Sequence, residues 1–347
     1  RPFKRKNILS SNFSMTHIKE VHYVDIVTAA NVGKPRKTCL LAEFYICQNG
    51  ISIVVIIDGV CNNGFQFQTF INECAKTRIT VIRFDYRGHG RSDDVPIGCE
   101  GLSLDECADD ARRVLEYFYE KHGLGMKKSE KKVTVVCYSL GAQVALTFAS
   151  DERNEDVVNG IAFVNGTFDP AFHGVFGIAL GDFVAKSLKN SKVLFAIVVC
   201  WLQVHMFMLS LFPFLSSVIA RFFVKCDSKS FRQFWKHCRR VQCKAYLSLA
   251  LDAHANSKLE VIEWLESKRA VPMLCIFGTD DKLVNVSRSI ETVKALAPST
   301  EIETVQGGCH ALLVHEKFKH KVALRLVNFC SNAAFDIDSK SLNLVLG

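Results

Sequence analysis

The amino-acid sequence predicts an α/β protein with a mostly parallel central sheet, helices on both faces of the sheet and an inserted helical cap. Short apolar runs alternate with longer amphipathic stretches, which is the order of repeated βαβ units. The apolar runs are continuous rather than alternating, which indicates strands that are covered on both faces. Residues 167–268 are rich in Phe, Leu and Val but hold no strand pattern, which predicts the cap.

The elements are expected in the following order. Two strands at 17–27 and 38–47, joined through the Gly-Lys-Pro-Arg-Lys sequence at 33–37, predict an antiparallel hairpin at the sheet edge. Further strands are expected at 51–58, 79–85, 133–138, 160–165, 273–277 and 301–305. Helices are expected at 65–77, 102–122, 140–149, 286–296 and 317–332.

The length of 347 residues exceeds what one hydrophobic core usually holds, so an insertion or a second domain is expected. We divide the chain into a basic N-terminal segment at 1–16, a first part of the core at 17–166, a hydrophobic helical cap at 167–268, a second part of the core at 269–334 and a polar C-terminal tail at 335–347.

Residues 133–146 run a buried-strand pattern directly into a helix, with Ser139 at the junction. A residue in such a strand-to-helix turn has a strained backbone and an exposed side chain, which is how a nucleophile elbow presents its serine. The turn needs small residues two positions away on either side. Gly141 supplies one, and Cys137 stands where glycine is more usual. Taken alone, the motif also fits a serine that only caps a helix.

An acid and a base follow this serine in the order that serine hydrolases of this kind use. A short apolar strand breaks at Gly278 into a loop that carries Asp280 and Asp281. A later strand ends in a glycine turn that presents His310. Three matching pieces at strand ends predict a Ser-Asp-His triad.

On these motifs the chain resembles the α/β-hydrolase fold superfamily, from about residue 21 to about residue 329. The sequence from Asp85 to Ser92 is similar to the D-x-R-G-x-G-x-S loop of that superfamily, and the likeness implies a structural role for His89. The resemblance also places the acid three residues after the glycine at the strand end, which selects Asp281 over Asp280. It points to the esterase branch that includes monoacylglycerol-lipase-like enzymes with a helical cap.

The same resemblance implies an oxyanion hole made by the backbone N–H groups of Val60 and Leu140. The superfamily usually carries His-Gly before the first of these donors, whereas this chain has Asp58-Gly59. A carboxylate beside a developing oxyanion would oppose catalysis, so we expect the Asp58 side chain to point away from it.

Residues 193–220 contain no Lys, Arg, Asp or Glu and are long enough for a transmembrane helix. A single crossing would separate Ser139 from Asp281 and His310, so we reject it. Two alternatives remain: a segment that enters one leaflet and turns back at Pro213, and a buried pair of cap helices. We expect peripheral membrane contact through the cap, aided by the basic residues Lys186, Lys189, Lys192, Arg221, Lys225 and the start of the chain at 1–6.

The net charge of +8 permits attraction to anionic partners, but basic and aromatic residues do not interleave as in RNA-binding proteins, so no nucleic-acid partner is expected. The 14 cysteines are spread singly without zinc-binding spacing, and they indicate reduced thiols of an intracellular protein. We expect a cytoplasmic or peripherally membrane-associated protein. Because the chain begins at Arg1, a targeting segment upstream is possible.

The sequence therefore predicts a serine hydrolase that cleaves a carboxylic ester of a hydrophobic acyl or lipid substrate through an acyl-enzyme on Ser139. Acyl transfer or thioester cleavage on the same triad are alternatives, as is a binding protein of this fold that has lost catalysis. No cofactor or metal ion is implied.

Overall fold

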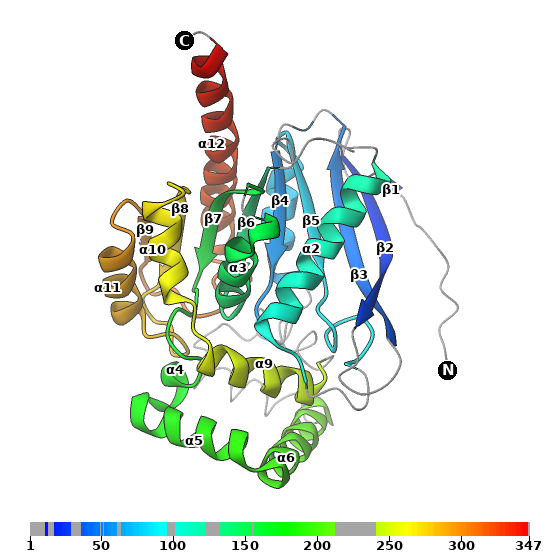
Figure 1. The fold of residues 1–347 in the computed structure, drawn as a ribbon, viewed down its shortest axis with the longest axis vertical. Coiled ribbons are helices and arrows are strands. Elements are labelled where there is room, and N and C mark those ends of the chain that lie inside the picture. The colour runs from blue at the N-terminus through cyan, green and yellow to red at the C-terminus, as the bar shows by residue number, and fades with distance from the viewer. Residues whose placement is uncertain are drawn as a thin grey trace.

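The computed structural model describes residues 11–12, 17–28, 36–48, 50, 52–60, 64–95, 101–122, 132–154, 156–211 and 241–345. Within these residues the core is a nine-stranded sheet in the order β1-β2-β3-β5-β4-β6-β7-β8-β9 (Figure 1). The strands are β1 (Ser11–Asn12), β2 (His17–Thr28), β3 (Arg36–Cys47), β4 (Ser52–Ile57), β5 (Ile79–Phe84), β6 (Val133–Tyr138), β7 (Val158–Val164), β8 (Met273–Gly278) and β9 (Glu301–Val305).

The sheet is antiparallel at one side and parallel elsewhere. β2 pairs antiparallel with β1 and β3, and β3 pairs antiparallel with β5. From β5 through β4, β6, β7 and β8 to β9, every pairing is parallel. Both the predicted hairpin near the edge and the mostly parallel sheet are confirmed. β5, β6 and β8 are buried along their whole length, which explains why their sequences are mostly apolar.

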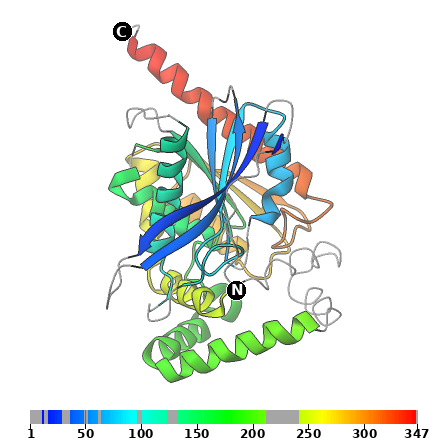
Figure 2. The same cartoon turned by 90° about the vertical axis from the view of Figure 1, so that its right-hand side faces the viewer.

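Helices cover both faces of the sheet (Figure 2). Side chains of α2 (Leu104–Lys121), α3 (Gly141–Ser150), α10 (Leu259–Ser267) and α11 (Val286–Leu296) join one hydrophobic core, whereas α1 (Gln68–Cys74) and α12 (Lys319–Val345) join a second core on the other face. Short 3₁₀ turns at Phe65–Phe67 and Glu152–Asn154 precede α1 and follow α3.

The start of α2 illustrates how the sequence sets an element boundary. The Ser103 hydroxyl accepts a hydrogen bond from the Glu106 N–H at 3.2 Å, and the Glu106 carboxylate accepts one from the Ser103 N–H at 3.1 Å. This capping box satisfies two N–H groups that have no partner within the helix and is worth about 1 kcal/mol.

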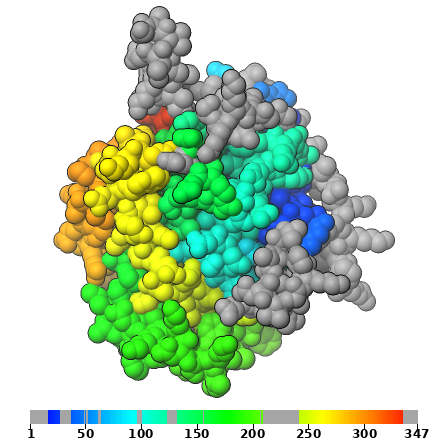
Figure 3. All heavy atoms as spheres, viewed as in Figure 1, coloured from blue at the N-terminus to red at the C-terminus, as the bar shows by residue number. Residues whose placement is uncertain are grey.

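The described residues of the stretch after β7 form helices. These are α4 (His173–Phe176), α5 (Ile178–Asn190), α6 (Lys192–Leu211) and α9 (Cys243–Ala255), followed by α10. α4, α5 and α6 project from one end of the molecule (Figures 1 and 3). The expected cap also included α9 and α10, but apolar side chains of both helices belong to the main core.

The structure also bears on the expected end of the last helix and on the expected membrane-contacting segment. The last helix was expected to end at 332, but α12 continues to Val345 across the expected start of a polar tail. Pro213, Arg221, Lys225 and residues 1–6 lie outside the described residues. Within the described parts of the chain, no helix is both long and apolar enough to span a bilayer.

Candidate active site

Ser139 occupies the turn between β6 and α3 with a left-handed backbone, at φ 52°. Its N–H donates to the Val164 carbonyl of β7 at 3.1 Å, and its own carbonyl accepts from Ala142 and Thr167 at 3.0 and 3.1 Å. This conformation is energetically unfavourable for a residue other than glycine, so it persists only where surrounding contacts hold it. These three bonds hold the predicted elbow in place.

The two small residues around Ser139 have different structural roles. A Cβ atom at Gly141 would lie 2.4 and 2.5 Å from the carbonyl oxygens of Asp58 and Ile57, so only glycine lets α3 begin this close to the end of β4. Cys137 is fully buried in the main core and its thiol donates to the Ala162 carbonyl at 3.4 Å. A cysteine is tolerated there because its side chain packs beside β7.

The structure brings Ser139, His310 and Asp281 into one hydrogen-bonded chain. His310 Nε2 lies 3.0 Å from Ser139 Oγ, and His310 Nδ1 lies 2.7 Å from Asp281 Oδ2. The side chains of His310 and Asp281 are almost completely buried. Oδ1 of Asp281 accepts from the N–H groups of Leu283 and Val284 at 2.8 and 3.1 Å, which fixes the orientation of the carboxylate.

Two buried side chains that sequence reasoning missed hold the histidine loop. The Asn165 amide donates to the carbonyls of His310 and Cys309 at 2.7 and 3.2 Å and accepts from the Gly278 N–H at 2.8 Å. The Tyr138 hydroxyl donates to the same His310 carbonyl at 2.8 Å. Asn165 itself has φ 45°, a region that Asn tolerates better than most residues. It joins the ends of β7 and β8 to the loop that carries His310.

The carboxylate of Asp58 accepts hydrogen bonds from other residues of its own loop. Oδ1 accepts from the Gly59 N–H at 2.7 Å and from the Gln66 side chain, and Oδ2 accepts from the Gly64 N–H at 2.7 Å. Burial raises the pKa of Asp58 to about 7, although the Gly64 and Gly59 N–H groups act in the opposite direction. The Asp58 carbonyl accepts from the Tyr86 hydroxyl at 2.9 Å. Of the two expected oxyanion donors, Val60 lies within this loop, directly after Gly59, and Leu140 immediately precedes the first residue of α3.

The glycine loop from Asp85 to Ser92 closes on itself and on α2. Asp85 accepts from the Arg91 N–H at 2.9 Å through its side chain and from the Ser92 hydroxyl at 2.5 Å through its carbonyl. Arg87 forms a two-bond pair with the buried Asp110 of α2 at 2.8 and 3.0 Å. His89 is buried beside Tyr86, and burial lowers its pKa to about 4. These contacts give the loop a structural role.

The sequence matches the family described as serine aminopeptidase, S33, over residues 48–317. The chain belongs to the S33 family of α/β-hydrolases. This family match covers the elbow, the carboxylate loop and the histidine loop, so the resemblance drawn from the motifs is confirmed. A search among curated proteins found no match.

Solved structures with this fold show how the S33 chain compares with other α/β-hydrolases. A carboxylesterase structure from the thaumarchaeon Nitrososphaera gargenis is similar with a TM-score of 0.63 at 17% identity, covering 90% of this chain and 99% of that one. A putative aryl esterase from Burkholderia cenocepacia has a TM-score of 0.61 at 17% identity, with coverages of 89% and 98%. A bromoperoxidase from Bacillus anthracis has a TM-score of 0.61 at 19% identity, with coverages of 87% and 99%. At these identities the likeness establishes the fold.

Proposed function

We propose that this S33 family protein is a serine-dependent carboxylic ester hydrolase. The observation that carries the proposal is the continuous chain from Ser139 through His310 to the buried Asp281, with the serine on a left-handed turn at the end of β6. A nucleophile, a base within hydrogen-bond reach and a third group that orients the base are the parts that covalent acyl transfer needs.

In the first half of the proposed reaction, Ser139 Oγ attacks the ester carbonyl while His310 Nε2 takes its proton. The N–H groups of Leu140 and Val60 stabilise the oxyanion. The tetrahedral intermediate collapses, and His310 gives the proton to the departing alcohol. In the second half, water attacks the acyl-enzyme with His310 as base, and the carboxylic acid leaves. Asp281 holds the imidazole and stabilises its cation.

We further propose a hydrophobic acyl or lipid substrate, because the cap exposes a large apolar surface. Twelve of the fourteen large hydrophobic side chains that are exposed among the described residues lie on α4, α5 and α6. We call these twelve the apolar cap face: Val175, Phe176, Ile178, Leu180, Phe183, Val193, Leu194, Ile197, Trp201, Val204, Phe207 and Met208. Exposed apolar side chains gathered in this way on three consecutive helices are typical of an interaction site.

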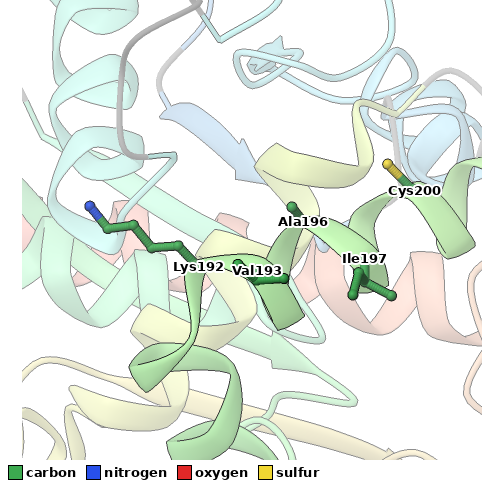
Figure 4. A pocket seen from close by; sticks show the side chains of 5 residues that line it. All are labelled: Lys192, Val193, Ala196, Ile197 and Cys200. Carbon is green, nitrogen blue, oxygen red and sulfur yellow. The ribbon is translucent and has the colours of Figure 1, made fainter.

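The charges beside the apolar cap face favour an anionic bilayer surface as its contact. Lys186, Lys189 and Lys192 are exposed along the end of α5 and the start of α6. A basic residue near an anionic membrane contributes about 1 kcal/mol, and buried apolar side chains add to this. A hollow of about 490 Å³ lies against α6, where its described wall consists of Lys192, Val193, Ala196, Ile197 and Cys200 (Figure 4).

The catalytic proposal is tested by hydrolysis of p-nitrophenyl esters with acyl chains of two to sixteen carbons. We expect activity that rises with chain length, is lost in Ser139→Ala and is retained in Ser150→Ala, whose hydroxyl only donates to the Thr147 carbonyl within α3. A fluorophosphonate should label the wild type and not Ser139→Ala. Absence of both labelling and turnover would contradict the proposal and favour a binding protein. Thioesters, alcohol acceptors and aminoacyl p-nitroanilides test the other reactions of the same triad.

The membrane proposal is tested by co-sedimentation with vesicles of phosphatidylcholine and phosphatidylserine. We expect Trp201→Glu and Phe207→Glu to reduce the bound fraction at least tenfold, because each places a charge on a side chain of which 56% and 61% is exposed. Leu324→Glu is the matched control, since this leucine on α12 is 51% exposed outside the cap. Equal sedimentation of all four proteins would contradict membrane contact through the cap.

A further inference from the structure

A cluster of two histidines and one aspartate joins three helices outside the triad. His173 begins α4, Asp182 lies in α5 and His254 lies near the end of α9. Nε2 of His173 and Nε2 of His254 lie 2.7 and 3.1 Å from the same Asp182 Oδ1. The two imidazole rings meet edge to face, with centroids 5.1 Å apart. Among the described residues this is the one group of three or more His, Cys, Asp or Glu side chains arranged closely enough to hold a metal ion.

We propose that His173, Asp182 and His254 form a binding site for a divalent transition-metal ion of the zinc type. The three ligand atoms all lie within 4.8 Å of one another. Zinc bonds of about 2.0–2.2 Å in a tetrahedron place neighbouring ligand atoms about 3.3 Å apart. The separations of the two Nε2 atoms from Asp182 Oδ1 are 2.7 and 3.1 Å, and the two nitrogens lie no more than 4.8 Å apart, so side-chain rotations of up to about 1.5 Å admit the ion.

The donor set selects the class of ion. Two imidazole nitrogens with one carboxylate oxygen suit zinc and its transition-metal neighbours, whereas Mg²⁺ and Ca²⁺ prefer oxygen ligands throughout. The Asp182 side chain is 59% exposed, while only about a tenth of each histidine side chain is. The ion would therefore be held from the protein side by the two rings and would keep its fourth position open to water.

An ion bound at this place takes the Nε2 atom of each ring, because both Nε2 atoms face Asp182 Oδ1. A neutral imidazole that binds a metal through Nε2 carries its proton on Nδ1.

The surroundings of the two Nδ1 atoms determine how strongly the site binds an ion. The Phe172 N–H lies 3.4 Å from His254 Nδ1, and this long contact is lost when Nδ1 gains a proton. Nδ1 of His173 is buried without a hydrogen-bond partner. Histidine ligands without a supporting acceptor typically bind a metal about 10- to 100-fold more weakly. We therefore expect affinity in the micromolar range rather than that of a permanent structural zinc.

An ion at this place would connect the cap to the core. α9 contributes Ala245, Leu249, Ala250 and Ala253 to the main core, whereas α5 carries part of the apolar cap face. The three ligands would thus fix α4 and α5 against α9, which lie next to one another in Figure 1. Occupancy of the site would determine how firmly the apolar cap face is held.

The test is calorimetric titration of chelator-treated full-length protein with Zn²⁺, together with Co²⁺ titration followed by visible absorption. We expect one equivalent bound by the wild type, at least tenfold weaker binding in Asp182→Asn and His173→Gln, and wild-type binding in His320→Gln. His320 is an exposed histidine on α12, so it controls for adventitious surface binding.

Thermal unfolding gives a second readout. At about 100 times the wild-type dissociation constant, Zn²⁺ should raise the Tm of the wild type by a few degrees and raise that of Asp182→Asn by no more than about half as much. Since Asp182 is exposed, circular dichroism of this variant should match the wild type. Binding that is absent in the wild type, or equal in all four proteins, would overturn the proposal. The outcome is independent of whether Ser139 hydrolyses esters.

Discussion

Replacing Asp281 by Asn is the sharpest test of how the triad is arranged. Oδ1 of Asp281 accepts from the N–H groups of Leu283 and Val284, whereas Oδ2 faces His310 Nδ1 at 2.7 Å. An Asn must place its carbonyl oxygen at the Oδ1 position, because its NH₂ group there would face two further donors. Its NH₂ group is then directed at His310 Nδ1, which has to act as an acceptor.

The magnitude follows from the tautomer that this imposes. An imidazole that accepts at Nδ1 carries its proton on Nε2, which lies 3.0 Å from Ser139 Oγ. Such an Nε2 cannot take the serine proton. The wrong tautomer at a triad histidine lowers kcat by about 10⁴, or roughly 5 kcal/mol of transition-state stabilisation. We expect a loss of this size for Asp281→Asn on p-nitrophenyl esters, with KM little changed.

Asp280→Asn is the matched control. The Asp280 backbone N–H donates to the Gly308 carbonyl at 2.8 Å, and this bond does not depend on the side chain. We expect this variant to keep kcat within about tenfold of the wild type, because Asp281 still holds the base. Equal losses in the two variants, or a folded Asp281→Asn within tenfold of the wild type, would refute the assignment of the acid.

Two further variants test the supports of the site. Asn165→Ala removes three buried hydrogen bonds and places alanine at φ 45°. We therefore expect guanidinium unfolding to show a loss of about 2–4 kcal/mol of unfolding free energy. A loss below about 0.5 kcal/mol would contradict the role of Asn165. Burial raises the pKa of Asp58 from 3.8 to about 7 in the folded state. The folded state is therefore stabilised by the protonated carboxyl below pH 4, and this contribution, up to about 4 kcal/mol of unfolding free energy, is lost as the pH rises through 7. Asp58→Asn should therefore show a smaller loss of stability between pH 4.5 and 8 than the wild type, and identical pH dependence would show that Asp58 does not titrate in this range.

The sheet and its helices were predictable because each depends on a local pattern. Mostly apolar runs of six residues marked β4, β6 and β8, and the turn at Ser139 was marked by a strand pattern that enters a helix without a linker. The length of α12 was not predictable in this way. Its polar second half has no apolar stripe to signal a helix, yet the helix continues to Val345 from the part that packs in the second core.

Contacts between distant segments account for what the sequence could not reveal about the site. Asn165 looks like an ordinary turn residue, and its role becomes visible only when β7, β8 and the histidine loop meet around its amide. The His173, Asp182 and His254 cluster shows no ligand spacing, because its members come from three helices. By contrast, Ser139, Asp281 and His310 of the proposed triad each follow a strand end, and parallel strands bring such ends to one edge of the sheet.

The position of Asp58 explains how a carboxylate can stand where the superfamily usually has histidine. Its two oxygens accept from Gly59, Gly64 and Gln66, so the negative charge is met by three donors of the same loop. These hydrogen bonds partly offset the negative charge. They therefore weaken any repulsion that the carboxylate would exert on an oxyanion bound by Val60 and Leu140 in the proposed reaction. Because burial raises the pKa to about 7, part of the population is also neutral near physiological pH. The carboxylate therefore places no unbalanced charge beside Ser139, and its presence does not argue against the proposed hydrolase activity.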